Sequence, residues 1–299
     1  MSEERVDKAW QKQGLGKYSV AAILGTLKHY GVAVDEEGFK TLSASKYPLQ
    51  IVEEWAPRWK GTGQFSRFPF FAADELWARL SGERLAPVTY AERLAKLLGE
   101  LNRMLNGAPD AKVGPGFKGL EELKAQVPQK DGKVDPNFVG EVAARLGPEG
   151  FKFFQRVSVE LAKQGHADDA EEFAALEAFL FPALSGVSQA LVKGMKGGAD
   201  KEAATGELVT LAKDGAREPG TRLSALDSLI EIQSLPQALE VSRELFEAGE
   251  KAQDFHMALD AGQRLLWLYQ KTGGNPAEAK QYEERLRKVA AEHSTAHAH

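Results

Sequence analysis

The chain has 299 residues and a formal net charge of −5, with 43% hydrophobic and 27% charged residues. This composition is typical of a soluble globular protein with one or two domains. Cysteine is absent, which excludes disulfides, thiolate zinc sites and cysteine nucleophiles.

No apolar run reaches the roughly 18 residues that a membrane span needs. The first residues, MSEERVDKAWQKQG, lack the apolar core of a secretory signal, so we expect a cytoplasmic protein without membrane partners. Residues 1–106 hold 15 Lys+Arg and 13 Asp+Glu, whereas residues 107–299 hold 23 and 30. An acidic second part suits a phosphate backbone poorly, because such binding needs clustered cations. We therefore expect no nucleic-acid partner.

The first third of the chain predicts short helices separated by turns. The apolar run KYSVAAILGTLKHY ends at Gly31, a residue that readily terminates a helix. Leucines at positions 94, 97, 98 and 101 form a stripe at helical spacing. Helices are predicted here over residues 17–30, 35–42, 49–59, 68–80 and 88–105.

Glycine and proline then interrupt the pattern. The segments NGAPDAKVGPGFKG (106–119) and VPQKDGKVDP (127–136) place a domain boundary within residues 107–136. Helices are predicted beyond it over residues 136–146, 148–164, 168–181, 186–196, 199–214, 220–233, 236–249, 252–272 and 276–292. Strand-like alternation is confined to Ala86–Tyr90, which contains Pro87, so the fold class is predicted to be all-α.

Residues 150–182 predict two antiparallel helices that pack closely. Apolar and small residues recur on one face of the first helix, and Gly165 can adopt the left-handed conformation that ends it. Asp168 and Asp169 suit the first turn of the second helix, where acids favour the helix dipole. The residues predicted to form the contact are Phe154, Val157, Ser158, Leu161, Ala170 and Ala174.

In order and spacing, these residues and Pro182 resemble the tetratricopeptide repeat (TPR). Ala238 lies 68 residues after Ala170, which equals two TPR periods of 34, and Leu265, Tyr269 and Ala279 outline another unit. The resemblance covers the C-terminal half and is degenerate. The departures are Phe154 where the family has Trp, Ser158 where it has Gly, and Ala174 where it has Phe. An ordinary bundle of helical hairpins is the alternative.

The resemblance implies an α-solenoid whose repeats contact their neighbours and leave a concave surface. The predicted organisation is an all-α N-terminal domain (1–106), a Gly/Pro-rich linker region (107–135), a TPR-like helical repeat domain (136–292) and a disordered tail (293–299).

Motifs for chemistry are weak, and we predict no catalytic, cofactor-binding or metal-binding residues. Gly114-x-Gly116-x-x-Gly119 matches a dinucleotide fingerprint, but it lies in a loop-like segment without a preceding strand. Ser43-x-x-Lys46 and Lys271-Thr272-Gly273 match penicillin-binding motifs, but the second is predicted to end a helix. The six histidines include no His-Glu-x-x-His pair.

Residues 55–71 hold the densest aromatic cluster, and cations are interleaved with it. Such side chains pack domain cores, and they also occur at interface hot spots and on base-stacking surfaces. Core and partner surface both remain open as interpretations. The possible partner-binding residues are Trp55, Arg58, Trp59, Lys60, Phe65, Arg67 and Phe68.

The sequence therefore predicts a non-enzymatic interaction, scaffold or adaptor protein that binds a protein or peptide in a helical-repeat groove. The acidic C-terminal half favours a basic or neutral partner segment. The alternative is an enzyme or a small-ligand protein in which Arg58, Lys60 and Arg67 hold an anionic ligand at the aromatic cluster.

Overall fold

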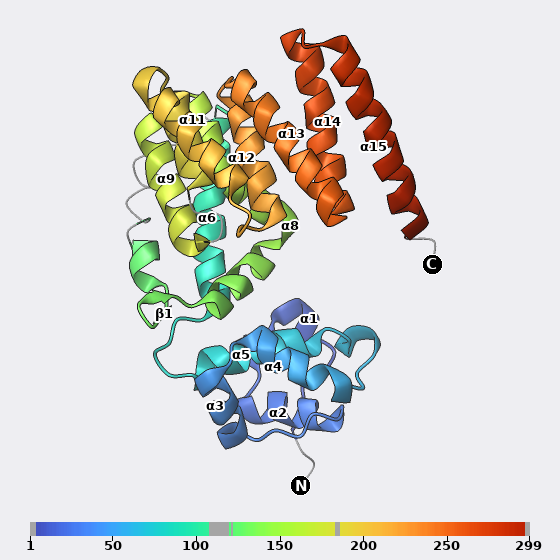
Figure 1. Cartoon of the computed structure of the whole chain (residues 1–299). Coiled ribbons are helices and arrows are strands. Elements are labelled where there is room, and N and C mark those ends of the chain that lie inside the picture. Colours follow the sequence, from blue (N-terminus) through green and yellow to red (C-terminus); the bar gives the residue numbers. More distant parts are fainter. Residues whose placement is uncertain (1–3, 108–119, 121, 183–185, 297–299) are drawn as a thin grey trace. The chain divides into compact units, whose positions relative to one another are not determined.

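The computed structural model describes residues 4–107, 120, 122–182 and 186–296. Nearly all of its regular structure is helical, so the predicted all-α class is confirmed (Figure 1). The dinucleotide-like glycines, Gly114 to Gly119, lie outside the described residues. The helices with Greek-letter labels are α1 (Trp10–Gln13), α2 (Val20–His29), α3 (Glu36–Ser45), α4 (Pro48–Trp55), α5 (Phe68–Leu80), α6 (Pro87–Leu105), α8 (Pro136–Lys163), α9 (Ala167–Leu180), α10 (Val187–Met195), α11 (Gly198–Lys213), α12 (Pro219–Glu231), α13 (Leu235–Ala252), α14 (Phe255–Thr272) and α15 (Pro276–Ala296).

Short 3-10 turns η1 (Leu15–Lys17), η2 (Ala56–Arg58) and η3 (Gly63–Phe65) connect the first helices. The strands β1 (Gln129–Lys130) and β2 (Lys133–Val134) form an antiparallel hairpin in which Gln129 pairs with Val134. Asp131 and Gly132 form its turn with φ of 55° and 74°. Two successive positive φ angles suit a tight hairpin, and Asp-Gly is a favoured pair for them.

The chain divides into two compact units, and the first contains two separate stretches of sequence. Unit 1 comprises Met1–Asn102 and Glu121–Lys152, and unit 2 comprises Arg103–Leu120 and Phe153–His299. Residues 121–152, which the sequence analysis divided between a linker and the repeat domain, thus belong with the N-terminal helices. Helix α8 continues from one unit into the other after an interruption at Gly147, whose φ is 70°.

Aromatic residues fill the core of unit 1. Phe138 of α8 is fully buried and packs edge-on against Tyr47 and Tyr90, with ring centres 5.7 and 5.4 Å away. Tyr47 also stacks on Trp77 at 5.8 Å. The indole N–H of Trp77 donates to the Lys46 carbonyl at 3.0 Å. The start of α8 is therefore an integral part of this core.

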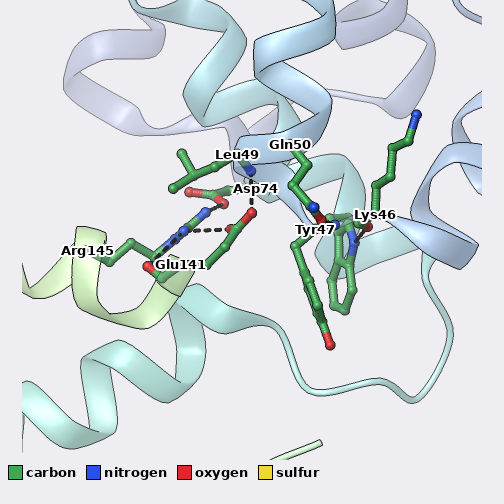
Figure 2. A network of polar contacts seen from close by, with 8 residues as sticks. Lys46, Tyr47, Leu49, Gln50, Asp74, Glu141 and Arg145 are labelled. Carbon is green, nitrogen blue, oxygen red and sulfur yellow. Dashed lines mark hydrogen bonds and ion pairs between the residues drawn. The ribbon is translucent and has the colours of Figure 1, made fainter. Parts of the chain in front are cut away.

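A polar network fixes the same helix to α4 and α5 (Figure 2). Arg145 donates to Glu141 Oε2 at 2.7 Å and forms an ion pair with Asp74. The other oxygen of Glu141 accepts the backbone N–H of Leu49 at 2.6 Å, at the first turn of α4. Burial raises the pKa values of both Asp74 and Glu141, although Arg145 opposes the shift in each. Desolvation therefore outweighs pairing at these carboxyls.

Unit 2 consists of helix pairs packed in sequence. The six residues predicted to form the first helical contact are all fully buried, and the Phe154 and Phe173 rings lie 5.3 Å apart. Gly165 has a φ of 86°, and His166 N–H donates to the Leu161 carbonyl, which closes the turn between α8 and α9. Packed adjacent helix pairs, the coarser part of the repeat prediction, are therefore confirmed.

Beyond that hairpin, each helix contacts its successor and the helix after it. Helix α10 packs on α11 and α12. Helix α11 packs on α12 and α13, and α12 on α13 and α14 (Figure 1). Helices α13 and α15 are joined by Tyr282, whose hydroxyl donates to Glu247 at 2.9 Å, and by the Arg285–Glu250 ion pair. This order of contacts is the one that a helical array produces.

We expect Gly249→Ala to lower the stability of unit 2 by about 2 kcal/mol, because α13 and α14 approach too closely for a side chain. A Cβ atom there would lie 2.8 Å from the backbone nitrogen of Ala258. The control is Gly206→Ala in α11, where a Cβ meets open space; it should raise stability by about 1 kcal/mol through helix propensity. Hydrogen exchange of the α11 to α14 amides measures both effects, and equal effects of the two changes would contradict the close approach.

Ala86–Tyr90, the segment with strand-like alternation, contains the first turn of α6, in agreement with the predicted helix over residues 88–105, and Pro87 is suited to the first helical position. One local prediction is wrong: the tail predicted to be disordered over residues 293–299, of which residues 297–299 lie outside the described residues, is helical to Ala296. There the Ser294 hydroxyl donates to the Ala290 carbonyl, and the His293 ring lies 4.8 Å from that of His256.

Candidate functional site

The aromatic residues predicted to bind a partner are mainly core residues of unit 1. Trp55, Phe65 and Phe68 are buried, and Trp59 is half-buried and stacked on Phe68 with ring centres 6.0 Å apart. Trp59 lies in the loop between η2 and η3, which packs on the end of α2, where Lys60 N–H donates to the Tyr30 carbonyl at 2.8 Å. Core packing, one of the two open interpretations, therefore accounts for these four aromatic residues.

The cations of the same cluster, Arg58, Lys60 and Arg67, are exposed. Only Arg67 lines the cavity that lies beside the cluster. The guanidinium of Arg67 lies 6.0 Å from the ring centre of Phe71. The three cations are therefore not gathered around this cavity, as an anion site formed by all of them would require.

The cavity beside the cluster has a volume of about 700 Å³ and lies within unit 1. Its walls come from α1 and the turn after it, from α5 and the residues just before it, and from the first turns of α6. Trp10 and Phe71, with ring centres 5.3 Å apart, form an apolar wall. The charged residues among its lining are Arg67, Asp74, Glu75 and Glu92.

The carboxylates of this cavity differ in how they are neutralised. Glu75 pairs with Arg79 at 2.6 Å, and Asp74 shares Arg145 with Glu141 (Figure 2). Glu92 has no ion pair within the part of the chain that the structure describes, and its charge helps to raise the pKa of Asp74. The carboxylates that line the cavity therefore outnumber the arginines that pair with them.

A second surface lies in unit 2, between α12 and α14. Trp267 of α14 is 44% exposed, an unusual position for so large an apolar side chain. It borders a shallow hollow of about 350 Å³ whose other lining residues are Ile230, Gln263 and Arg264. This surface was not among the predicted sites.

Internal hydrogen bonds engage the guanidinium of Arg264, which lines this hollow together with Trp267. Its Nε and one terminal nitrogen donate to the two oxygens of Asp227 at 2.5 and 2.9 Å, and the other terminal nitrogen donates to the Asp260 carbonyl at 2.8 Å. A guanidinium whose donors are engaged in this way still offers its flat face for stacking. The hollow is therefore suited to an apolar or aromatic side chain.

Within the described residues, no group of three or more His, Asp or Glu side chains is placed to hold a metal ion. The described helices include none with the length and apolarity needed to cross a bilayer. Comparison with known proteins found no matching family model, no similar curated protein and no similar solved structure.

Proposed function

We propose that the protein is a cytoplasmic, non-enzymatic interaction or adaptor protein, and that its TPR-like helical array binds a peptide segment of a partner. The observation that carries the proposal is Trp267, a large apolar side chain left exposed at a hollow between two helices of the array. Tryptophan is enriched among the residues that dominate binding energy at interfaces.

The chemistry of the hollow narrows the partner segment. The engaged guanidinium of Arg264 favours stacking by an aromatic or aliphatic side chain, and the excess of acids over bases in residues 107–299 favours basic or uncharged flanking residues. We therefore propose a segment with one apolar anchor and no acidic residues beside it.

Selection of random displayed peptides on the full-length protein tests this proposal. We expect the selected peptides to carry an aromatic or large aliphatic residue, and Trp267→Ala to weaken their binding at least tenfold, the effect of a hot-spot residue. Fluorescence anisotropy of labelled peptides gives the affinities.

The matched control is Phe70→Ala, because Phe70 is 45% exposed but lies in unit 1. It should leave the affinities unchanged. Peptides that bind the Trp267→Ala variant as tightly as the original protein, or a selection dominated by acidic peptides, would refute the proposal.

A further inference from the structure

The cavity of unit 1 has the size and lining of a small-molecule site. Its volume of about 700 Å³ falls within the range of roughly 300 to 1,000 Å³ that is usual for ligand pockets. Three separate segments form its walls: residues 10–16, 66–78 and 88–92. All belong to unit 1, so the site is complete within one compact body.

Its apolar wall is open to a ligand. Phe71 is 47% exposed, and its ring packs on that of Trp10, which is almost completely buried. The neighbouring Phe70 is equally exposed but does not line the cavity. Phe71 therefore offers apolar surface that a bound molecule would remove from water.

The carboxylates of the lining favour a cationic ligand. Asp74 and Glu141 share one arginine, so this network carries a net negative charge when both are ionised. Glu92 adds a further carboxylate whose repulsion of the Asp74 charge contributes to the raised pKa of Asp74. A cationic group near Glu92 and Asp74 would relieve this repulsion, because opposite charges at close range favour ionised carboxylates. Arg67, the one cation of the lining, lies against Phe71.

We infer that this cavity binds an organic cation joined to an apolar group, such as an arylalkylamine. The apolar part packs on Phe71, and the ammonium or guanidinium group lies near Glu92 and Asp74. The same chemistry is available from a free amine and from an arginine side chain beside an apolar residue in a peptide.

Calorimetric titration of the full-length protein at low salt tests the inference. The probes are 2-phenylethylamine, the anion 3-phenylpropionate and the dipeptide N-acetyl-Phe-Arg-amide. We expect the amine to bind at least about tenfold more tightly than the anion, because the charge of the ligand changes sign while its apolar part remains. If the dipeptide binds more tightly than the amine, the cation comes from a peptide. If the amine binds more tightly, the cation comes from a small molecule.

Matched variants locate the site. Glu92→Gln should weaken amine binding about fivefold, the effect of one partly screened charge. Glu100→Gln removes the same charge from an exposed position of α6 that does not line the cavity, and it should have no effect. Phe71→Ala should weaken binding, while Phe70→Ala should not.

The inference fails if neither the amine nor the dipeptide binds at concentrations up to about 10 mM, if the anion binds as well as the amine, or if Glu92→Gln and Glu100→Gln act alike. Trp267→Ala should leave amine binding unchanged. Failure of this inference can therefore be distinguished from failure of the proposed peptide binding in unit 2.

Discussion

Replacing Arg145 by methionine should lower the free energy of unfolding of unit 1 by about 3 kcal/mol, because it leaves the carboxylates of Glu141 and Asp74 without their shared partner. The side chain of Glu141 is 4% exposed and that of Arg145 is 13% exposed. Methionine retains most of the buried volume, so the loss reports on the missing charge rather than on a cavity.

The double variant Arg145→Met with Glu141→Gln separates these effects. Glutamine keeps an oxygen to accept the Leu49 N–H and carries no charge, so part of the lost stability should return, while Asp74 still lacks its partner. Four of the five tryptophans, at positions 10, 55, 59 and 77, lie in unit 1. Tryptophan fluorescence in a Trp267→Phe background during urea unfolding therefore monitors unit 1 alone. A loss below about 1 kcal/mol for Arg145→Met would show that the pair contributes no more than a surface ion pair.

Glu177→Gln should stabilise unit 2 by roughly 3 kcal/mol above pH 8 and have little effect near pH 5. Glu177 of α9 is 3% exposed, and its Oε2 finds no hydrogen-bond partner among the described residues. Burial raises its pKa from 4.5 to about 7, and a hydrogen bond with Ser188 opposes the shift only in part. The predicted energy follows from that difference in pKa.

The direction of this pH dependence of stability follows from proton uptake by the folded protein. Between about pH 4.5 and 7 the folded protein holds a proton on Glu177 that the unfolded chain releases, so stability rises as pH falls through this window. Glutamine cannot titrate and removes this contribution. Hydrogen exchange of the α9 and α10 amides at pH 5 and pH 8.5, corrected for intrinsic rates, measures the difference. A benefit of Glu177→Gln that is the same at both pH values would contradict the raised pKa.

Helix positions could be predicted well because local signals and packing agree. The predicted break between residues 146 and 148 corresponds to Gly147, whose positive φ interrupts α8 before Pro148. The predicted helix over residues 68–80 has the same limits in the structure as α5, which carries Pro69 in its first turn. Such signals lie within a few residues of the boundary that they set.

Long-range organisation could not be predicted in the same way. The hairpin at Asp131-Gly132 was interpreted as linker because glycine and proline interrupt the segment, and its strands of two residues each are too short to show period-two alternation. The inclusion of residues 121–152 in unit 1 depends on Phe138 meeting Tyr47 and Tyr90, and on Arg145 meeting Asp74, 71 residues away. No local pattern records those contacts.

Prediction of the candidate sites from sequence is limited in the same way. Residues 55–71 attracted attention because aromatic side chains are dense there, yet density alone does not distinguish core from surface, and Trp55 and Phe68 are core residues. Trp267 carried a usable signal, because it falls outside the stripe of Leu265, Leu268 and Tyr269 that faces the interior. The cavity of unit 1 gave none, since Trp10, Phe71 and Glu92 come from three segments that only folding brings together.

The place of α8 in the N-terminal core has a consequence for biosynthesis. When the ribosome has produced the first 106 residues, Tyr47 and Tyr90 still lack Phe138, and the start of α4 lacks the Glu141 carboxylate. Roughly 40 more residues must be added before this unit can close, a delay on the order of several seconds at common translation rates. Throughout that interval the nascent N-terminal helices present an unfinished apolar surface, which is the kind of surface that chaperones bind.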